Sequence, residues 1–234
     1  MSFEYSIEES DLVLEWTEDD IGAEENLIAR FKKIAGIATD IDGNTYRTVK
    51  IGDQWWMAEN LKVTHYRNGD DIPNVTDNNT WINLTTGALC SFENNDSHIS
   101  TYGRLYNWYA AADNRNIAPI GWHVATDAEW IALVYYLGGE EVAGGKMKTT
   151  GTTLWNDPNA GATNESGFSA ISGGIRYYDS GGFGFMGHTA FFWSSTESNS
   201  DNAWLLRLRH YNGNVVLTDG HKKQAGFSVR CIKD

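Results

Sequence analysis

Hydrophobic and polar positions divide the chain into a short helical segment and a longer region of strands and loops. In residues 21–34 apolar side chains recur at helical spacing, and Gly36 can end that helix. From residue 39 the pattern changes, because YRTVKIG at 46–52 alternates between two faces and Gly52-Asp53 predicts a tight turn after it. A β-hairpin therefore opens the longer region.

The clearest helix follows Thr126, which with Glu129 forms a capping-box pattern ahead of WIALVYYLGG. Gly138-Gly139 predicts its end. Stretches rich in Gly, Asn, Asp and Ser at 66–101 and 144–190 predict loops. Short strands close the chain, and Asn212-Gly213 between two of them predicts a hairpin. The pattern indicates an α+β domain with antiparallel strands.

Composition indicates a folded, acidic protein. The 234 residues are 13% aromatic, which disordered chains are not. Lys and Arg total 18 against 31 Asp and Glu, a net charge of −13, which argues against nucleic acid and anionic membrane surfaces as partners. No apolar run approaches the ~20 residues of a membrane span. The acidic start, MSFEYSIEES, does not resemble a secretory signal, so we expect either removal of a signal or release by another route, such as lysis.

Six blocks of sequence resemble one family in order and spacing. They are GNTYRTVKIGDQWWMAENLK, YGRLYNWYAA, APIGWHVATDAEW, GGKMKTTGTTLWNDPNAGATNESGFSAISGG, FFWSSTES and GFSVRCIKD, and they cover residues 39–234. The family is the Fibrobacter succinogenes major paralogous domain, which is related to C-type lectins and to the formylglycine-generating-enzyme fold. The resemblance implies a C-type-lectin-like fold: a twisted antiparallel sheet, two helices, long loops and chain ends close together. Residues 1–38 lie outside it and are expected to dock on a virion tail or other partner, to form a homotrimer, or to be a plain extension.

The same scaffold is similar to variable proteins of diversity-generating retroelements, which display ligand-contacting residues from a C-terminal variable region. Adenine mutagenesis of AAC or AAT codons cannot yield Lys, Gln, Glu, Met or Trp, and between Ser198 and His221 only Trp204 is of these types. We therefore expect a variable-type region at about 194–225. An ordinary hairpin with polar faces is the alternative.

Strand alternation separates scaffold from display residues in this region. Trp204, Leu206 and Leu208 are expected on the core face, with residues of opposite parity facing a ligand. The expected ligand-binding residues are Asn199, Asp201, Asn202, Leu205, Arg207, Arg209, His210, Tyr211, Val216, Thr218, Asp219 and His221.

The sequence offers little catalytic or metal-binding chemistry. Cys90 and Cys231 form no CxxC motif, so they are expected to be structural or to form a disulfide, and an oxidising cysteine pair like that of formylglycine-generating enzymes is the enzymatic alternative. Trp155-Asn156-Asp157 is similar to the calcium motif of sugar-binding lectins but lacks its partner motif, so a loop turn is expected rather than a Ca²⁺ site. We expect no catalytic residue and no cofactor.

These observations predict a receptor-binding protein, not an enzyme. Its partner would be a cell-surface protein or glycan, and its expected place is a phage tail, as an adhesin of the virion. The alternative is a secreted bacterial surface protein that binds polysaccharide, with some of the 10 Trp as stacking platforms.

Overall fold

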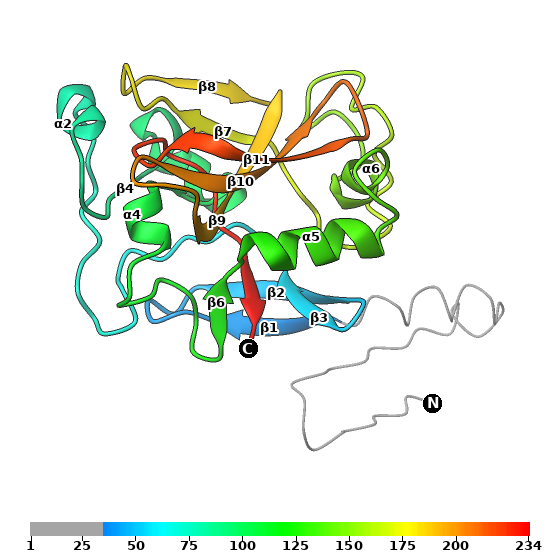
Figure 1. Ribbon diagram of the computed structural model, residues 1–234, viewed down its shortest axis with the longest axis horizontal. Helices are drawn as coiled ribbons and strands as arrows, with labels where there is room; N and C mark the ends of the chain where they lie inside the picture. The colour runs from blue at the N-terminus through cyan, green and yellow to red at the C-terminus, as the bar shows by residue number, and fades with distance from the viewer. Residues whose placement is uncertain (1–34) are drawn as a thin grey trace, which may run out of the picture.

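A computed structural model describes residues 35–234 and places the first and last strands in one sheet. The helix expected at 21–34 and any docking or oligomerisation by residues 1–34 lie outside the described residues. Five strands pair antiparallel in the order β1-β2-β3-β12-β6 (Figure 1). Their bounds are β1 (Ala35–Thr39), β2 (Thr45–Ile51), β3 (Gln54–Met57), β6 (Trp122–Val124) and β12 (Cys231–Lys233).

The expected start of the domain at residue 39 is wrong, because β1 already pairs with β2 from Ala35. Gly36, expected to end a helix, lies within this strand. The reason for a glycine here is a close approach: a Cβ at Gly36 would lie 2.8 Å from Oγ1 of Thr48, which accepts a hydrogen bond from the Gly36 amide. The hairpin of β2 and β3 is confirmed, with Ile51 opposite Gln54.

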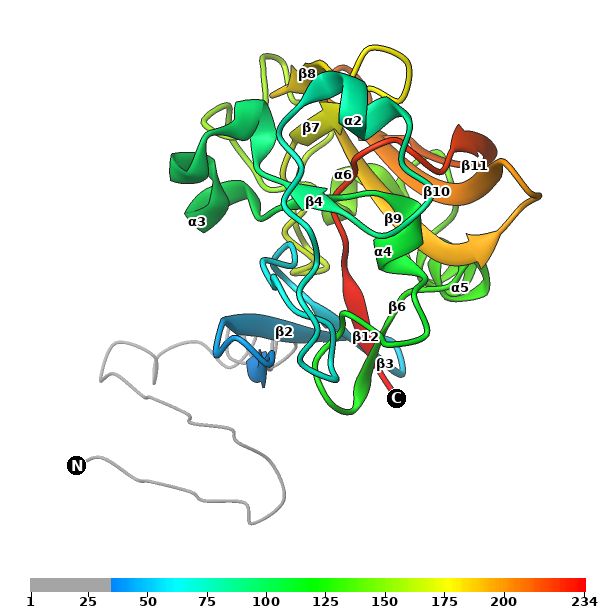
Figure 2. The same ribbon diagram turned by 90° about the vertical axis from the view of Figure 1, so that its left-hand side faces the viewer.

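A second sheet carries the C-terminal hairpin. Its order is β11-β10-β9, all antiparallel, and the domain also contains two two-stranded sheets, β4-β5 and β7-β8 (Figure 2). The bounds are β9 (Thr189–Glu197), β10 (Asn202–Arg209), β11 (Val215–Lys222), β7 (Gly173–Arg176), β8 (Phe183–Met186), β4 (Leu89–Cys90) and β5 (Leu105–Tyr106). The loop between β10 and β11 contains Asn212-Gly213, as expected, but it spans residues 210–214 rather than a two-residue turn.

One regular helix, α5 (Asp127–Tyr136), packs between the two sheets (Figure 1). Its capping box is confirmed, because Thr126 Oγ1 accepts from the Glu129 amide and a Glu129 carboxylate oxygen accepts from the Thr126 amide at 2.8 Å. The other described helices are short: α2 (Asn78–Ile82), α3 (Ile99–Tyr102), α4 (Trp108–Ala111), α6 (Ala143–Met147) and the 3₁₀ turns Phe92–Asn94 and Asp96–His98. The α+β class is thus confirmed.

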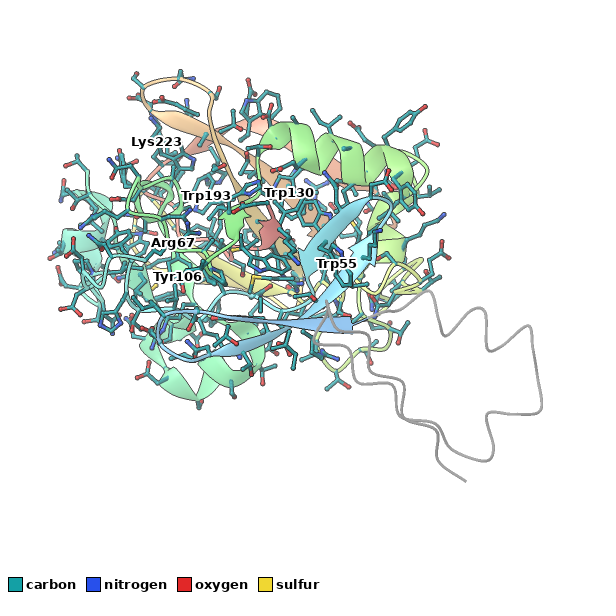
Figure 3. The ribbon with its side chains drawn as sticks, turned by 90° about the horizontal axis from the view of Figure 1, so that it is seen from below. Trp55, Arg67, Tyr106, Trp130, Trp193 and Lys223 are labelled. Carbon is teal, nitrogen blue, oxygen red and sulfur yellow. The ribbon has the colours of Figure 1, made fainter. Side chains whose placement is uncertain are left out.

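Aromatic side chains fill the core on both sides of β9. On one side Trp130 of α5 lies 4.7 Å from Trp56 and 5.9 Å from Phe192 between ring centroids. On the other side Trp193 lies 4.3 Å from Phe227 and donates its indole N–H to the Tyr106 carbonyl. Both tryptophans lie in the interior of the domain (Figure 3). The sheet is therefore buried on both faces along part of its length.

Buried cations hold the long loops in place. Arg230 is fully buried and donates to the carbonyls of Met57, Phe168 and Ser169 and to Oδ1 of Asn60. Burial lowers the pKa of Arg230 to about 9. Buried backbone carbonyls outside a β-sheet still need a hydrogen-bond donor. The Arg230 guanidinium supplies such donors to the carbonyls of the loop residues Phe168 and Ser169.

Lys148 likewise donates hydrogen bonds to loop carbonyls near the C-terminal hairpin. Its ammonium donates to the carbonyls of Ala160, Arg209 and Asn212 at 2.8–3.0 Å, and burial lowers its pKa to about 8. The end of β10 and the loop after it are thereby attached to the scaffold.

A bridging histidine makes stability depend on pH. His123 of β6 lies 2.7 Å from carboxylate oxygens of Glu129 and of Asp234. Burial lowers its pKa, but the bonds to Asp234 and Glu129 outweigh burial and raise the pKa above its ordinary value of 6.5. The bridge therefore stabilises the fold fully below pH 6.5 and loses this effect as pH rises through the raised pKa.

We expect His123→Gln to lower the unfolding free energy by about 1 kcal/mol or less at pH 6, since the site is partly exposed. The difference from the wild type should shrink at pH 9, where the wild-type imidazole is neutral. Urea denaturation at both pH values measures it. A difference that is equal at pH 6 and pH 9 would contradict a charged bridge.

Candidate functional site

The two cysteines are structural. Cys90 and Cys231 are both free and fully buried, in different core clusters, so the expected alternative of a disulfide is wrong. Burial raises the pKa of the Cys90 thiol to about 11 and also raises the pKa of Cys231. A reactive cysteine needs the opposite shift, toward thiolate.

The triplet at 155–157 lies in a loop, as expected. Trp155 packs in the core at 1% exposure, and Asn156 bonds through its amide nitrogen to Nε2 of His188. Across residues 35–234, no three His, Cys, Asp or Glu side chains gather in a way that could hold a metal ion.

An open hollow of about 630 Å³ lies beside the turn between β1 and β2. Lys62, His65 and Arg104 line it together with Asp42. Asp42 bonds to His65 at 2.5 Å, and Asp71 holds the other ring nitrogen at 2.9 Å. Charges of both signs thus meet at the hollow, and part of them are already paired within the chain.

The alternation expected for β10 holds from Leu206 to Arg209, where buried leucines alternate with half-buried arginines, whereas the pairing shifts between Ala203 and Leu205. Arg207 lies opposite Val216 of β11 and Phe191 of β9, while Leu205 lies opposite Thr218. Arg207, Val216 and Thr218 are half-buried and share the face expected to contact a ligand.

Leu205 does not belong to a ligand surface, which corrects the expectation. Its side chain is only 1% exposed and joins the core cluster of Trp193 and Phe227. The expectation failed because it assumed that this face is open along all of β10, whereas residues around Phe227 cover its middle. Trp204, expected in the core, is half-buried where the pairing shifts between Ala203 and Leu205.

The expected site residues divide between the two ends of β10. This strand spans eight residues, so its ends lie roughly 23 Å apart. Asn199, Asp201 and Asn202 lie at or beside the turn that enters β10, whereas His210 and Tyr211 follow its last residue. These two groups do not form one contact patch.

Residues at the entering end serve the turn itself. The Asn199 side chain accepts from the amides of Asp201 and Asn202 at 3.0–3.1 Å. Asp201 pairs with Lys222 at 2.9 Å, and the buried Lys223 binds the Ser200 carbonyl. We assign these side chains to the scaffold. Asp219 is exposed nearby, 3.5 Å from the Ser198 hydroxyl.

At the other end of β10, Arg209 and Tyr211 lie on the face expected to contact a ligand, whereas His210 is hydrogen-bonded to the scaffold. Tyr211 is 54% exposed, and the Arg209 guanidinium lies 5.6 Å from the centre of its ring. His210 instead donates two hydrogen bonds to its neighbours: its Nδ1 donates to the Asp157 carbonyl at 3.0 Å, and its amide donates to the His188 carbonyl.

Two aromatic residues missed by sequence reasoning complete the surface. Tyr178, after β7, lies 5.8 Å from the His221 ring and is 40% exposed. Phe185 of β8 lies 6.0 Å from Phe191 and is 48% exposed. The β7–β8 hairpin lies beside the β9–β11 sheet (Figure 1). We define the hairpin face as Tyr178, Phe185, Arg207, Arg209, Tyr211, Val216, Thr218 and His221.

The polar side chains of the hairpin face make no hydrogen bond and no ion pair within the described chain. The Arg207 and Arg209 side chains make no hydrogen bond and no ion pair with residues 35–234. The other arginines in this range all donate at least one hydrogen bond. Nε of Arg207 and Nδ1 of His221 are buried and unbonded. Burial and the neighbouring Arg209 lower the pKa of Arg207, and burial and Arg207 lower the pKa of His221.

Fold and site together define a mixed α+β domain whose last hairpin presents cations and aromatic rings. The family model of the Fibrobacter succinogenes major domain matches residues 49–233. The chain therefore belongs to this family, as the six sequence blocks indicated. Neither curated proteins nor solved structures provide a match. Among the described helices, none is long and apolar enough to cross a membrane.

Proposed function

We propose that this chain is a ligand-binding protein, built on a lectin-like scaffold, with the hairpin face as its recognition surface. The observation that carries the proposal is the pair Arg207 and Arg209, whose side chains make no hydrogen bond and no ion pair with residues 35–234, although Arg209 lies over the Tyr211 ring. Arginine beside exposed tyrosine is the composition typical of binding hot spots. No catalytic role is part of the proposal.

The more specific form of the proposal is a phage tail adhesin that binds a cell-surface protein or glycan and is diversified by a retroelement. The residue types at 198–221 support it. The fold limits where variation is tolerable, because several residues of this stretch are in the core: Ala203, Leu205, Leu206, Leu208 and Val215. Adenine-rich codons are therefore expected at the hairpin-face residues between 207 and 221 and not at these core positions.

Sequencing the flanking DNA tests diversification. We expect a near-repeat of the 3′ coding end, with adenines at the codons of the hairpin-face residues between 207 and 221, together with a reverse-transcriptase gene. If the repeat and the gene are both missing, diversification is wrong, although binding is not.

A secreted bacterial surface protein that binds polysaccharide is the second candidate. The tryptophans give it little support, since Trp56, Trp81, Trp130, Trp155 and Trp193 are fully buried. Its support comes instead from the exposed rings of Tyr178, Phe185 and Tyr211, which could stack on sugars.

A glycan array, together with intact bacterial cells, tests binding for both candidates. We expect the full chain to bind a subset of glycans or cells, and the double variant Tyr178→Ala/Tyr211→Ala to lose most of that signal. Tyr135→Ala is the matched control, because Tyr135 is 84% exposed on α5, outside the hairpin face. Equal signals from the wild type and the double variant would exclude the hairpin face as the binding surface.

A further inference from the structure

We propose that the hairpin face recognises an acidic glycan, carboxylated or sulfated, with Arg207 and Arg209 as the anchors of the acidic group. This inference rests on the proposed function and adds the chemical class of the ligand. The alternation of β10 places the two guanidinium-bearing side chains on one face, two residues apart, so their Cα atoms lie roughly 7 Å apart.

The absence of a carboxylate beside this pair is the first argument. The chain contains 31 Asp and Glu against 18 Lys and Arg, so acidic partners are abundant. The other arginines of the described range lie in bonds with carboxylates, carbonyls or amides, such as Arg115 with Asp70 and Asp113. Two like charges side by side repel each other, and an anionic group bound between them would remove that repulsion.

The unused N–H donors of the two guanidinium groups are the second argument. A guanidinium presents its N–H donors in a planar fork that matches carboxylate and sulfate oxygens. Arg207 and Arg209 use none of these donors within the described chain, whereas the fully buried Arg230 uses its nitrogens on four acceptors. The donors of the pair are thus available for an oxyanion.

The aromatic rings are the third argument, and they favour a glycan over an acidic peptide. Tyr178, Phe185 and Tyr211 are 40–54% exposed and come from two separate segments, the β7–β8 hairpin and the loop after β10. Flat rings of this kind provide an apolar face for the C–H side of a sugar ring. An acidic peptide would use the cations but has no need of three separate rings.

Preorganisation is the fourth argument. Lys148 holds the carbonyls of Arg209 and Asn212, so the backbone that carries one anchor is fixed before a ligand arrives. The entropy lost on binding is correspondingly smaller. The loop after β10 is also attached through the Ala160 amide, which donates to the His210 carbonyl at 2.7 Å.

Calorimetry of the full chain with heparin, polygalacturonate and neutral dextran tests the inference. We expect heparin or polygalacturonate, or both, to bind and dextran to bind at least tenfold more weakly. Arg207→Gln/Arg209→Gln should weaken acidic-glycan binding at least tenfold. Its thermal unfolding should stay close to that of the wild type, because these side chains make no hydrogen bond and no ion pair within the described chain. Arg47→Gln, a change of an exposed arginine on β2, is the matched control and should bind like the wild type.

Three outcomes would overturn the inference. Dextran binding as tight as acidic-glycan binding, no binding of either acidic glycan, or full binding by the double arginine variant each contradicts it. Tighter, arginine-dependent binding of poly-glutamate than of both polysaccharides would assign the face to acidic peptides instead. If array binding depends on Tyr178 and Tyr211 but not on the arginines, the proposed function stands and only the acidic class fails.

Discussion

Replacing Arg230 by methionine is expected to lower the unfolding free energy by about 3–5 kcal/mol. Methionine fills much of the same volume but donates nothing, so the carbonyls of Met57, Phe168 and Ser169 lose their charged donor in the core. A buried acceptor without a partner costs about 1–3 kcal/mol, and partial relaxation keeps the total below the sum. Chemical denaturation followed by tryptophan fluorescence measures the loss.

Arg47→Met is the control for this change. The Arg47 side chain is 68% exposed and, within the described residues, pairs with Glu59 alone, so its replacement should cost less than about 1 kcal/mol. If Arg230→Met costs no more than Arg47→Met, the long loops are not held by the buried guanidinium.

Leu205→Ala is expected to lower the unfolding free energy by about 2–5 kcal/mol, because it opens a cavity beside Trp193 and Phe227. Val216→Ala, one strand away on the hairpin face, is the matched comparison and should cost about 1 kcal/mol or less, since Val216 is half-buried. Denaturation of both variants distinguishes scaffold from display positions. A larger loss for Val216→Ala than for Leu205→Ala would return Leu205 to the ligand surface.

Elements set by neighbouring residues could be predicted from sequence. The capping box of Thr126 and Glu129, the hairpin around Gly52 and the alternation of the second half of β10, residues 206–209, each depend on a few adjacent positions, and all are present. The family blocks likewise placed the domain over most of the chain.

Features that depend on residues far apart in the chain could not be predicted from the sequence. Arg230 binds Asn60, 170 positions away, and nothing near either residue signals that bond. Leu205 has the same alternation as Arg207, and only the position of Phe227 in the fold decides that one is buried. Strand β1 could not be predicted, because Gly36 is typical of a helix end and its close approach to Thr48 exists only in the folded chain.

The candidate site shows the same division. Arg207, Arg209 and Tyr211 could be selected from the sequence because they follow one strand and its loop. Tyr178 and Phe185 belong to another hairpin in a glycine-rich stretch, and only tertiary packing brings that hairpin beside β11. The sequence predicts Asn199 as a contact residue, because asparagine is common both in ligand-binding loops and in turns. Here its side chain accepts hydrogen bonds within its own turn.

Hydrogen exchange of the full chain, with and without the glycan that binds most tightly on the array, tests the central claim most directly. The hairpin face predicts slower exchange at residues 178–186 and 207–221 on binding, with the core around Trp130 unchanged. Slower exchange confined to residues 41–44 and 62–69 would contradict it and would place ligand binding at the hollow beside the β1–β2 turn.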